Sequence, residues 1–260
     1  MSTCTLLDRL NAGETVFGLF SPYSDVCLAQ MAASTGADFI IFDAEHGYVS
    51  DLDIPGLALA AEREDCTALV RVPQIEPRTI GRFLDNGAAG IVAPMVNSAA
   101  DAKALKEALY YPPKGSRGLA PTKNMGFVLG DAVATQILQA NNSVLSIAQI
   151  ETKEAVENLD EILMDENLNV IFVGPADLST SLGHAMDFDN PMVISTLMEV
   201  AQKVNASDKH LGILAQTSEQ IQMTHMMGAR FIAGYIDTVI STGCQSYLTG
   251  ARTVIEQQGG

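Results

Sequence analysis

The sequence predicts a single-domain α/β fold, a (β/α)8 barrel, from the number of apolar runs and from their composition. Eight short runs rich in Val, Ile, Phe and Leu recur at intervals of roughly 20 to 35 residues, near the spacing expected of βα units. Most runs are apolar at consecutive positions, as strands buried on both faces of a parallel sheet are. The expected strands span residues 15–20, 38–43, 67–72, 90–95, 144–151, 170–174, 210–216 and 231–237.

Helix-like segments lie between these runs. Several open on Ser, Thr or Asp and several end at Gly, as capped helices tend to. They include residues 24–36, 76–87, 98–111, 152–163 and 218–229. An open, doubly wound sheet is the alternative, but no GxGxxG motif follows an early strand, so a dinucleotide-binding half is not supported. No linker-like segment interrupts the chain, and we expect residues 1–260 to form one barrel domain.

The stretch "YPPKGSRGLAPTKNMGFVLG" (residues 111–130) is the main insertion. Its Pro and Gly content predicts a long loop or lid, which we expect beside the barrel mouth.

Charge and composition exclude several classes of function. The 260 residues carry 15 Lys and Arg against 31 Asp and Glu, a formal charge of -16, which argues against nucleic acid and anionic membranes as partners. An acidic protein that handles a small anion needs a local cation, either a metal ion or an arginine. The four cysteines are scattered without a CxxC pair, and the N-terminus lacks a long apolar segment, so we expect a cytoplasmic protein without a membrane span.

Polar residues gather where the expected strands end, which is where the active site of a (β/α)8 barrel lies. One carboxylate there is most often a helix cap or an ion-pair partner, but caps do not require four strands to carry one at the same end. The residues are Asp43, Glu45, His46, Arg71, Gln149, Glu151 and Asp177.

Glu151 and Asp177 follow adjacent expected strands and would repel each other unless a proton or cation lay between them. Two carboxylates completed by water or substrate oxygens suit Mg²⁺ or Mn²⁺ better than structural zinc. In the alternative interpretation, Asp177 only caps the helix that begins near "LSTSLG".

Arg71, in "VRVP", has apolar neighbours and therefore needs an anionic mate, either a protein carboxylate or the substrate. The "GPAD" backbone opens a helix and offers N–H groups to a substrate carboxylate. Together these features indicate a site for a small 2-oxo acid. His46 is the candidate for proton transfer, with Asp43 to orient it.

Several blocks of the sequence resemble the HpcH/HpaI aldolases, metal-dependent class II pyruvate aldolases. The blocks are "FDAEHG", "RVP", "LDNGAAGIVAPMVNSAADA", "YPPKGSRG", "QIETKEAVENLDEI" and "FVGPADLSTSLG", and the resemblance covers roughly residues 5 to 255. It implies a (β/α)8 barrel in a hexamer, a trimer of dimers that exchange the last helix. It also implies cleavage of a 4-hydroxy-2-oxo acid to pyruvate and an aldehyde, and the reverse addition.

The resemblance also implies residue roles. Glu151 and Asp177 are similar to the metal ligands, for Mg²⁺ or Mn²⁺ with Co²⁺ as a further candidate, and Gln149 to a residue that contacts the metal's waters. Arg71 resembles the arginine that binds the keto oxygen and stabilises the enolate. His46 resembles the general base or acid. Asp43 and Asp85 resemble residues that support this histidine. The backbone at Gly174, Pro175 and Ala176 resembles the segment that binds the pyruvate carboxylate.

Two features depart from the family pattern. Residues 119–130 replace a stretch that usually contains Arg and Ser, and Tyr235 stands where the family tends to have a small residue. Glu45 is expected to be a structural or interface carboxylate, because Glu151 and Asp177 already fill the metal role. The role of Glu45 and the aldehyde accepted are left open.

Alternative functions are a related lyase or decarboxylase acting on a 2-oxo acid or a CoA thioester, and a barrel kept as a binding or assembly module. A Schiff-base aldolase is not favoured, because no lysine falls at an expected strand end.

Overall fold

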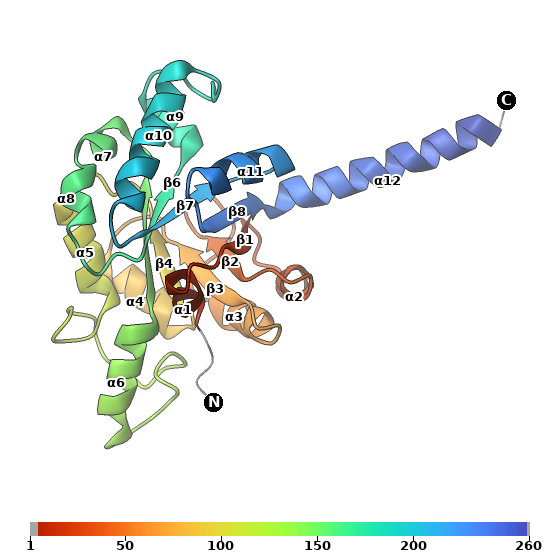
Figure 1. The fold of residues 1–260 in the computed structure, drawn as a ribbon. Coiled ribbons are helices and arrows are strands. Elements are labelled where there is room, and N and C mark those ends of the chain that lie inside the picture. The colour runs from red at the N-terminus through yellow and green to blue at the C-terminus, as the bar shows by residue number, and fades with distance from the viewer. Residues whose placement is uncertain (1–4, 259–260) are drawn as a thin grey trace.

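The chain forms a closed barrel of eight parallel strands that follow one another in sequence order (Figure 1). The computed structural model describes residues 5–258. Each strand lies within two residues of the bounds expected from its apolar run at both ends, so the predicted fold class is confirmed. The strands are β1 (Val16–Ser21), β2 (Phe39–Asp43), β3 (Thr67–Arg71), β4 (Gly90–Ala93), β5 (Leu145–Ile150), β6 (Val170–Val173), β7 (His210–Leu214) and β8 (Phe231–Tyr235).

Helices cover the outside of the barrel and return the chain from the C-terminal end of each strand to the start of the next. The first helix differs, because two of its leucines, Leu6 and Leu10, pack into the barrel interior from the N-terminal end. The helices are α1 (Leu6–Asn11), α2 (Val26–Ser34), α3 (Ile54–Glu62), α4 (Pro77–Asp85), α5 (Ala99–Leu109), α6 (Ala132–Ser143), α7 (Lys153–Glu157), α8 (Leu159–Leu163), α9 (Pro175–Ser181), α10 (Pro191–Asn205), α11 (Ser218–Met226) and α12 (Ile236–Gln258).

The apolar strands divide their side chains between two cores. In β2, Phe39 and Ile41 point into the barrel, whereas Ile40 and Phe42 pack against the surrounding helices. Phe39 stacks on Phe231 across the interior with 4.0 Å between ring centroids. The interior below the strand ends is therefore filled with aromatic and aliphatic groups, which leaves polar groups to the C-terminal end.

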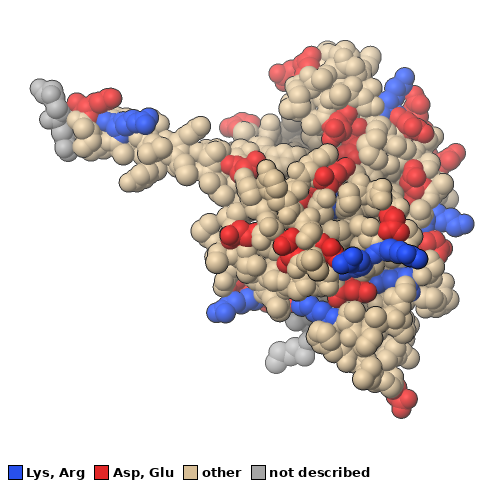
Figure 2. All heavy atoms as spheres, turned by 180° about the vertical axis from the view of Figure 1, so that it is seen from behind, with Lys and Arg blue, Asp and Glu red and all other residues tan. Residues whose placement is uncertain are grey.

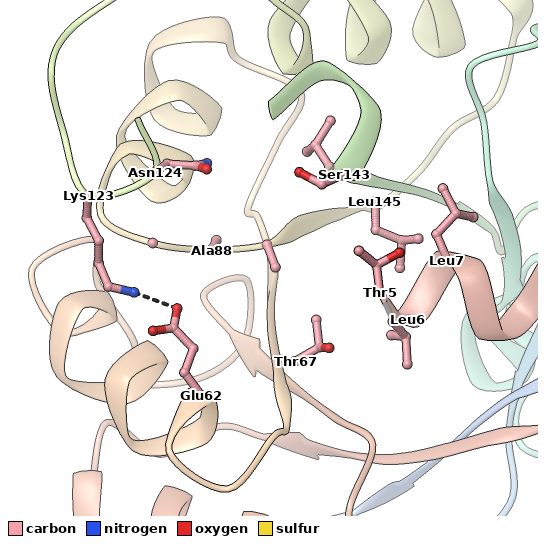
Figure 3. Close-up of a pocket in the computed structure, with 13 residues that line it drawn as sticks. Thr5, Leu6, Leu7, Glu62, Thr67, Ala88, Lys123, Asn124, Ser143 and Leu145 are labelled. Carbon is pink, nitrogen blue, oxygen red and sulfur yellow. Dashed lines mark hydrogen bonds and ion pairs between the residues drawn. The ribbon is translucent and has the colours of Figure 1, made fainter. Parts of the chain in front are cut away.

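The segment of residues 111–130 lies at the opposite end of the barrel from the one we predicted. It follows α5 and precedes α6 and β5, and a segment that follows a helix falls at the end where strands begin. Figure 3 shows this end: Lys123 pairs with Glu62 beside a cavity of about 340 Å³, next to the strand starts Thr67 and Leu145. The prediction of a lid beside this chain's own barrel mouth is wrong.

Helix α12 leaves the barrel after β8 and projects away from it (Figure 1). Ile236 is buried, but the helix beyond it is exposed and carries apolar side chains such as Val239 and Leu248, which are 55% and 48% exposed. Carboxylates are spread over the molecular face in Figure 2, in keeping with the formal charge of -16.

None of the helices within residues 5–258 is long and apolar enough to cross a membrane. Cys27, Cys66 and Cys244 are free thiols, while Cys4 lies outside the described residues.

Candidate active site

Asp43 and Arg71 form a buried ion pair at the C-terminal ends of β2 and β3, where they are register partners. Arg71 Nε donates to Asp43 Oδ1 (2.9 Å) and Nη2 donates to Oδ2 (2.6 Å). Burial raises the pKa of Asp43, but the Arg71 hydrogen bonds and charge outweigh it and bring this pKa below its usual value. The anionic mate that Arg71 requires is thus a protein carboxylate, and the two-point contact fixes the plane of the guanidinium.

Asp43 also shapes the loop that carries His46. Its Oδ1 accepts hydrogen bonds from the backbone N–H groups of Glu45 (3.0 Å) and His46 (3.2 Å). The His46 side chain itself is 69% exposed at the mouth. Asp43 therefore positions the backbone of His46, and its expected role in orienting the His46 side chain stays a prediction.

Glu45 points into the site, toward Arg71. Its Oε2 lies 3.3 Å from Arg71 Nε and 3.9 Å from His46 Nε2, and its side chain is only 17% exposed. Burial raises the pKa of Glu45, Arg71 and His46 oppose the rise, and the charges of Asp43 and Asp177 add to it. The carboxylate thus lies between the arginine and the histidine.

Glu151 is a buried carboxylate just beyond β5 that lacks a cationic partner in direct contact among the described residues. Oε1 accepts from the backbone N–H of Met95 (2.7 Å), and Oε2 accepts from Gln149 Nε2 (2.9 Å). Burial raises the pKa of Glu151 to about 7; the Met95 N–H opposes this, and the charges of Asp177 and Glu45 reinforce it. Gln149, predicted to support the metal site, is therefore in contact with the predicted ligand.

Asp177 lies in the first turn of α9, whose N-cap residue is Gly174. No side chain in the described part of the chain caps this helix, so Asp177 is not its N-cap, and its exposed carboxylate acts on both Glu45 and Glu151. The predicted cradle at Gly174, Pro175 and Ala176 therefore opens α9 beside Glu151.

Gly174 allows the backbone to approach Glu151 closely. A Cβ at this position would lie 2.8 Å from Glu151 Oε2 and 3.5 Å from Gln149 Nε2. We expect Gly174→Ala to displace the Glu151 carboxylate and weaken Mn²⁺ binding by roughly tenfold or more, the loss seen when groups that orient ligands are disturbed. Gly81→Ala is the matched control, because a Cβ there meets nothing within 4 Å. Calorimetric titration with Mn²⁺ measures both, and equal affinities for the two variants would contradict this role.

The residues at this edge fit a divalent cation. Glu151 and Asp177 offer the hard carboxylate oxygens that such a cation prefers, and the buried Glu151 has no cationic side chain in direct contact among the described residues. Within residues 5–258, no three His, Cys, Asp or Glu side chains form a complete metal cage. A metal here would therefore be held by two carboxylates and completed by oxygens from water or substrate.

The pKa of Glu151 predicts a pH dependence of metal binding. A cation must displace the proton that Glu151 carries below about pH 7, so affinity should fall about tenfold for each pH unit below that value. Mn²⁺ titrations between about pH 5 and pH 8, with proton release followed in buffers of different ionisation enthalpy, would measure this. Affinity that stays constant from about pH 5.5 to pH 7 would contradict the assignment of Glu151 as a ligand.

Asp85 is not brought to His46 within this chain, which corrects the predicted support of His46 by Asp85. It is the last residue of α4, and this helix runs back toward the N-terminal end of the barrel. Its Oδ1 accepts from Arg117 Nη2 (2.6 Å), and the Arg117 guanidinium lies over the Tyr111 ring at 4.5 Å. A residue at the end of a βα-unit helix lies far from the C-terminal strand ends.

Sequence reasoning missed the Met95 backbone N–H and the Phe20 ring. Met95 has a φ of 53°, a conformation uncommon for a side chain other than Gly, and this turns its N–H toward Glu151. Phe20 lies under the guanidinium of Arg71, with 5.1 Å from Cζ to the ring centroid. No residue type marks a backbone donor, but the inward position of Phe20 on β1 could have been deduced from strand alternation.

The C-terminal mouth of this parallel barrel holds two carboxylates, an arginine fixed by its ion pair and an exposed histidine. Such a site defines an enzyme for small oxo acids. The family model described as HpcH/HpaI aldolase/citrate lyase matches residues 16–241. The chain belongs to this family, and it is a carbon–carbon lyase of the aldolase type.

Two relatives and one solved structure illustrate the similarity. A hydroxypyruvate/pyruvate aldolase of Roseobacter denitrificans is 32% identical over 246 residues, which cover 92% of this chain and 94% of that protein. A 2-keto-3-deoxy-L-rhamnonate aldolase of Escherichia coli K12 is 31% identical, over 90% of this chain and 87% of that protein. The crystal structure of the citrate synthase SbnG is 29% identical with a TM-score of 0.88, over 98% of this chain and 100% of that one.

Proposed function

We propose that the protein uses this site to cleave a 4-hydroxy-2-oxo acid into pyruvate and an aldehyde, and to catalyse the reverse addition. The observation that carries the proposal is the buried Glu151, whose pKa is raised to about 7 beside Asp177 and opposite the Asp43–Arg71 pair. This arrangement suits a divalent cation and an anionic substrate together. The names of the aldolase relatives support the same reaction.

Glu151 and Asp177 would hold the metal, with Gln149 to fix Glu151 by its hydrogen bond. Mg²⁺ or Mn²⁺ is favoured by the oxygen ligands, and Co²⁺ is a further candidate. The bound cation supplies Lewis-acid stabilisation of the negative charge that develops on the keto oxygen.

The protein's own groups bind the substrate and move its protons. Arg71, held by Asp43, would donate hydrogen bonds to the keto oxygen, where enolate charge develops as the C3–C4 bond breaks. The backbone from Gly174 to Ala176 would receive the carboxylate. His46 would remove the proton from the 4-hydroxyl group so that the aldehyde leaves, and C3 of the enolate is then protonated to give pyruvate.

The oligomer and the compartment are parts of the same proposal. The projecting α12, with Val239 and Leu248 exposed, supports a helix that packs on another subunit in a hexamer, a trimer of dimers. We also propose that the protein is located in the cytoplasm.

The test is a screen of 4-hydroxy-2-oxo acids of different length and charge, with Mg²⁺, Mn²⁺ or Co²⁺ added and pyruvate measured as product. We expect pyruvate from at least one substrate and none after treatment with EDTA. Activity that survives EDTA, or pyruvate trapped on the protein by borohydride, would defeat the proposal. Oxaloacetate in the same screen separates an aldolase from a decarboxylase.

A further inference from the structure

Tyr235 ends β8 and belongs to the inward-facing row of that strand, above Phe231 and Ala233 in the interior core. Its ring lies 5.8 Å from the ring of Phe20, its register partner on β1. Phe20 in turn lies 5.1 Å from Cζ of Arg71. The three side chains form a continuous contact from β8 to the arginine, so Tyr235 borders the same space as the candidate active site.

Burial and the charged groups of the site together set the pKa of the Tyr235 phenol. Burial raises the pKa of Tyr235, Arg71 lowers it, and the charges of Asp43, Asp177 and Asp237 raise it further. The phenol is therefore neutral at ordinary pH and can donate a hydrogen bond. The backbone N–H of Tyr235 donates to Gln216 Oε1 (3.2 Å), but its hydroxyl has no hydrogen-bond partner among residues 5–258.

We propose that Tyr235 is a specificity-determining residue that selects small, uncharged aldehydes bearing a hydroxyl group. The inference rests on the proposed function, because it concerns the partner that joins pyruvate. The Tyr235 ring contacts the Phe20 ring, which lies under the Arg71 guanidinium, so a 2-oxo acid bound at Arg71 lies near the Tyr235 side chain. The group attached to the reacting carbonyl then meets the Tyr235 ring, which limits its size, and the free hydroxyl, which rewards a polar atom.

Tyr235 is half-buried, and an apolar aldehyde of the same size would displace water from its hydroxyl without offering a hydrogen-bond partner. Sites built to hydrogen-bond a substrate hydroxyl discriminate against analogues that lack it for this reason. Charge points the same way. Arg71 is already paired with Asp43 and lies 3.3 Å from Glu45, so a second anionic group on the aldehyde would compete with these two carboxylates for the guanidinium.

The test compares glycolaldehyde with propanal, which differ by a hydroxyl in place of a methyl group, as acceptors for pyruvate in the Mg²⁺-loaded enzyme. We expect wild type to prefer glycolaldehyde in kcat/KM, and Tyr235→Phe to reduce that preference by about 5- to 10-fold through loss of one hydrogen bond. Tyr235→Ala should raise the relative kcat/KM of bulkier aldehydes such as benzaldehyde. Tyr247→Phe, on the exposed part of α12, is the matched control and should behave as wild type.

A second measurement does not need turnover. The chain has six Tyr and no Trp, so tyrosine fluorescence reports on these residues alone. Pyruvate added with Mg²⁺ should change the fluorescence of wild type and Tyr247→Phe, and most of this change should be absent in Tyr235→Phe.

The outcomes separate the two proposals. Wild-type activity with an unchanged aldehyde preference and an unchanged fluorescence response in Tyr235→Phe would overturn the role of Tyr235 and leave the aldolase intact. No product with any aldehyde, together with a Tyr235-dependent fluorescence response, would overturn the reaction but keep Tyr235 at the ligand site. Absence of both signals would overturn both proposals.

Discussion

Glu151→Gln should abolish metal-dependent carbon–carbon cleavage while leaving the barrel folded. Without the charge of Glu151, Asp177 is the remaining ligand of the pair, and we expect kcat/KM to fall by roughly 10³-fold, the scale of losing several kcal/mol of Lewis-acid stabilisation. Calorimetric titration should show the loss of Mn²⁺ binding, and a pyruvate-release assay should show the loss of activity. Glu157→Gln, an exposed carboxylate on α7, is the control and should retain both.

The metal-free Glu151→Gln variant should be at least as stable as wild type at about pH 8. The pKa of Glu151 is about 7 in the folded protein, against an ordinary value of 4.5. The contribution of protonated Glu151 to folding stability is therefore fully present below about pH 4.5 and is lost as pH rises through 7. Above pH 7 the buried carboxylate costs about 3 kcal/mol, which the neutral amide avoids. The Oε1 of Gln149 is buried without a partner in the described part of the chain and could accept from the new amide after a flip. Thermal unfolding would contradict this account if the variant melted well below wild type at that pH.

Arg71→Ala should cost both stability and activity, because it leaves Asp43 buried without its partner. Removing one member of a buried ion pair typically costs about 3–5 kcal/mol, and loss of a donor to a developing oxyanion costs roughly 10²- to 10³-fold in kcat. Urea unfolding and steady-state kinetics measure the two effects. Arg63→Ala is the control, since the Arg63 side chain is 75% exposed and its ion pair with Glu64 should contribute about 1 kcal/mol or less.

The double variant Asp43→Asn with Arg71→Met separates the two roles of the ion pair. The asparagine amide keeps an oxygen for the backbone N–H groups of Glu45 and His46, and neither new side chain buries a charge. Stability should recover toward the wild-type value while activity stays lost. Recovery of activity along with stability would show that Arg71 is only structural.

The strands were predictable because a parallel strand buried on both faces has an almost wholly apolar sequence, which the runs at β2 and β6 show clearly. The barrel architecture predicts that polar residues at the C-terminal strand ends lie close together. Two of them, Gln149 and Glu151, form a hydrogen bond. The bond between Asp43 and Arg71 depends on strand register, which no single run encodes.

Two errors arose from placing residues by sequence rather than by the direction of their element. Asp85 ends a helix and the 111–130 segment follows one, so both lie toward the N-terminal end of the barrel. The direction of Glu45 could not be predicted, because loop side chains have no fixed periodicity. The Met95 N–H could not be predicted either, since a backbone donor at a φ of 53° leaves no mark in residue type.

The most direct test of the account is the exchange of pyruvate methyl protons with D₂O, followed by proton NMR, because enolisation of pyruvate needs no knowledge of the aldehyde. We expect wild type with Mg²⁺ to exchange these protons well above the rate in enzyme-free buffer, and EDTA or Glu151→Gln to reduce exchange to that background rate. Exchange at the wild-type rate in EDTA or in Glu151→Gln would contradict a metal-dependent enolate formed at this edge of the barrel.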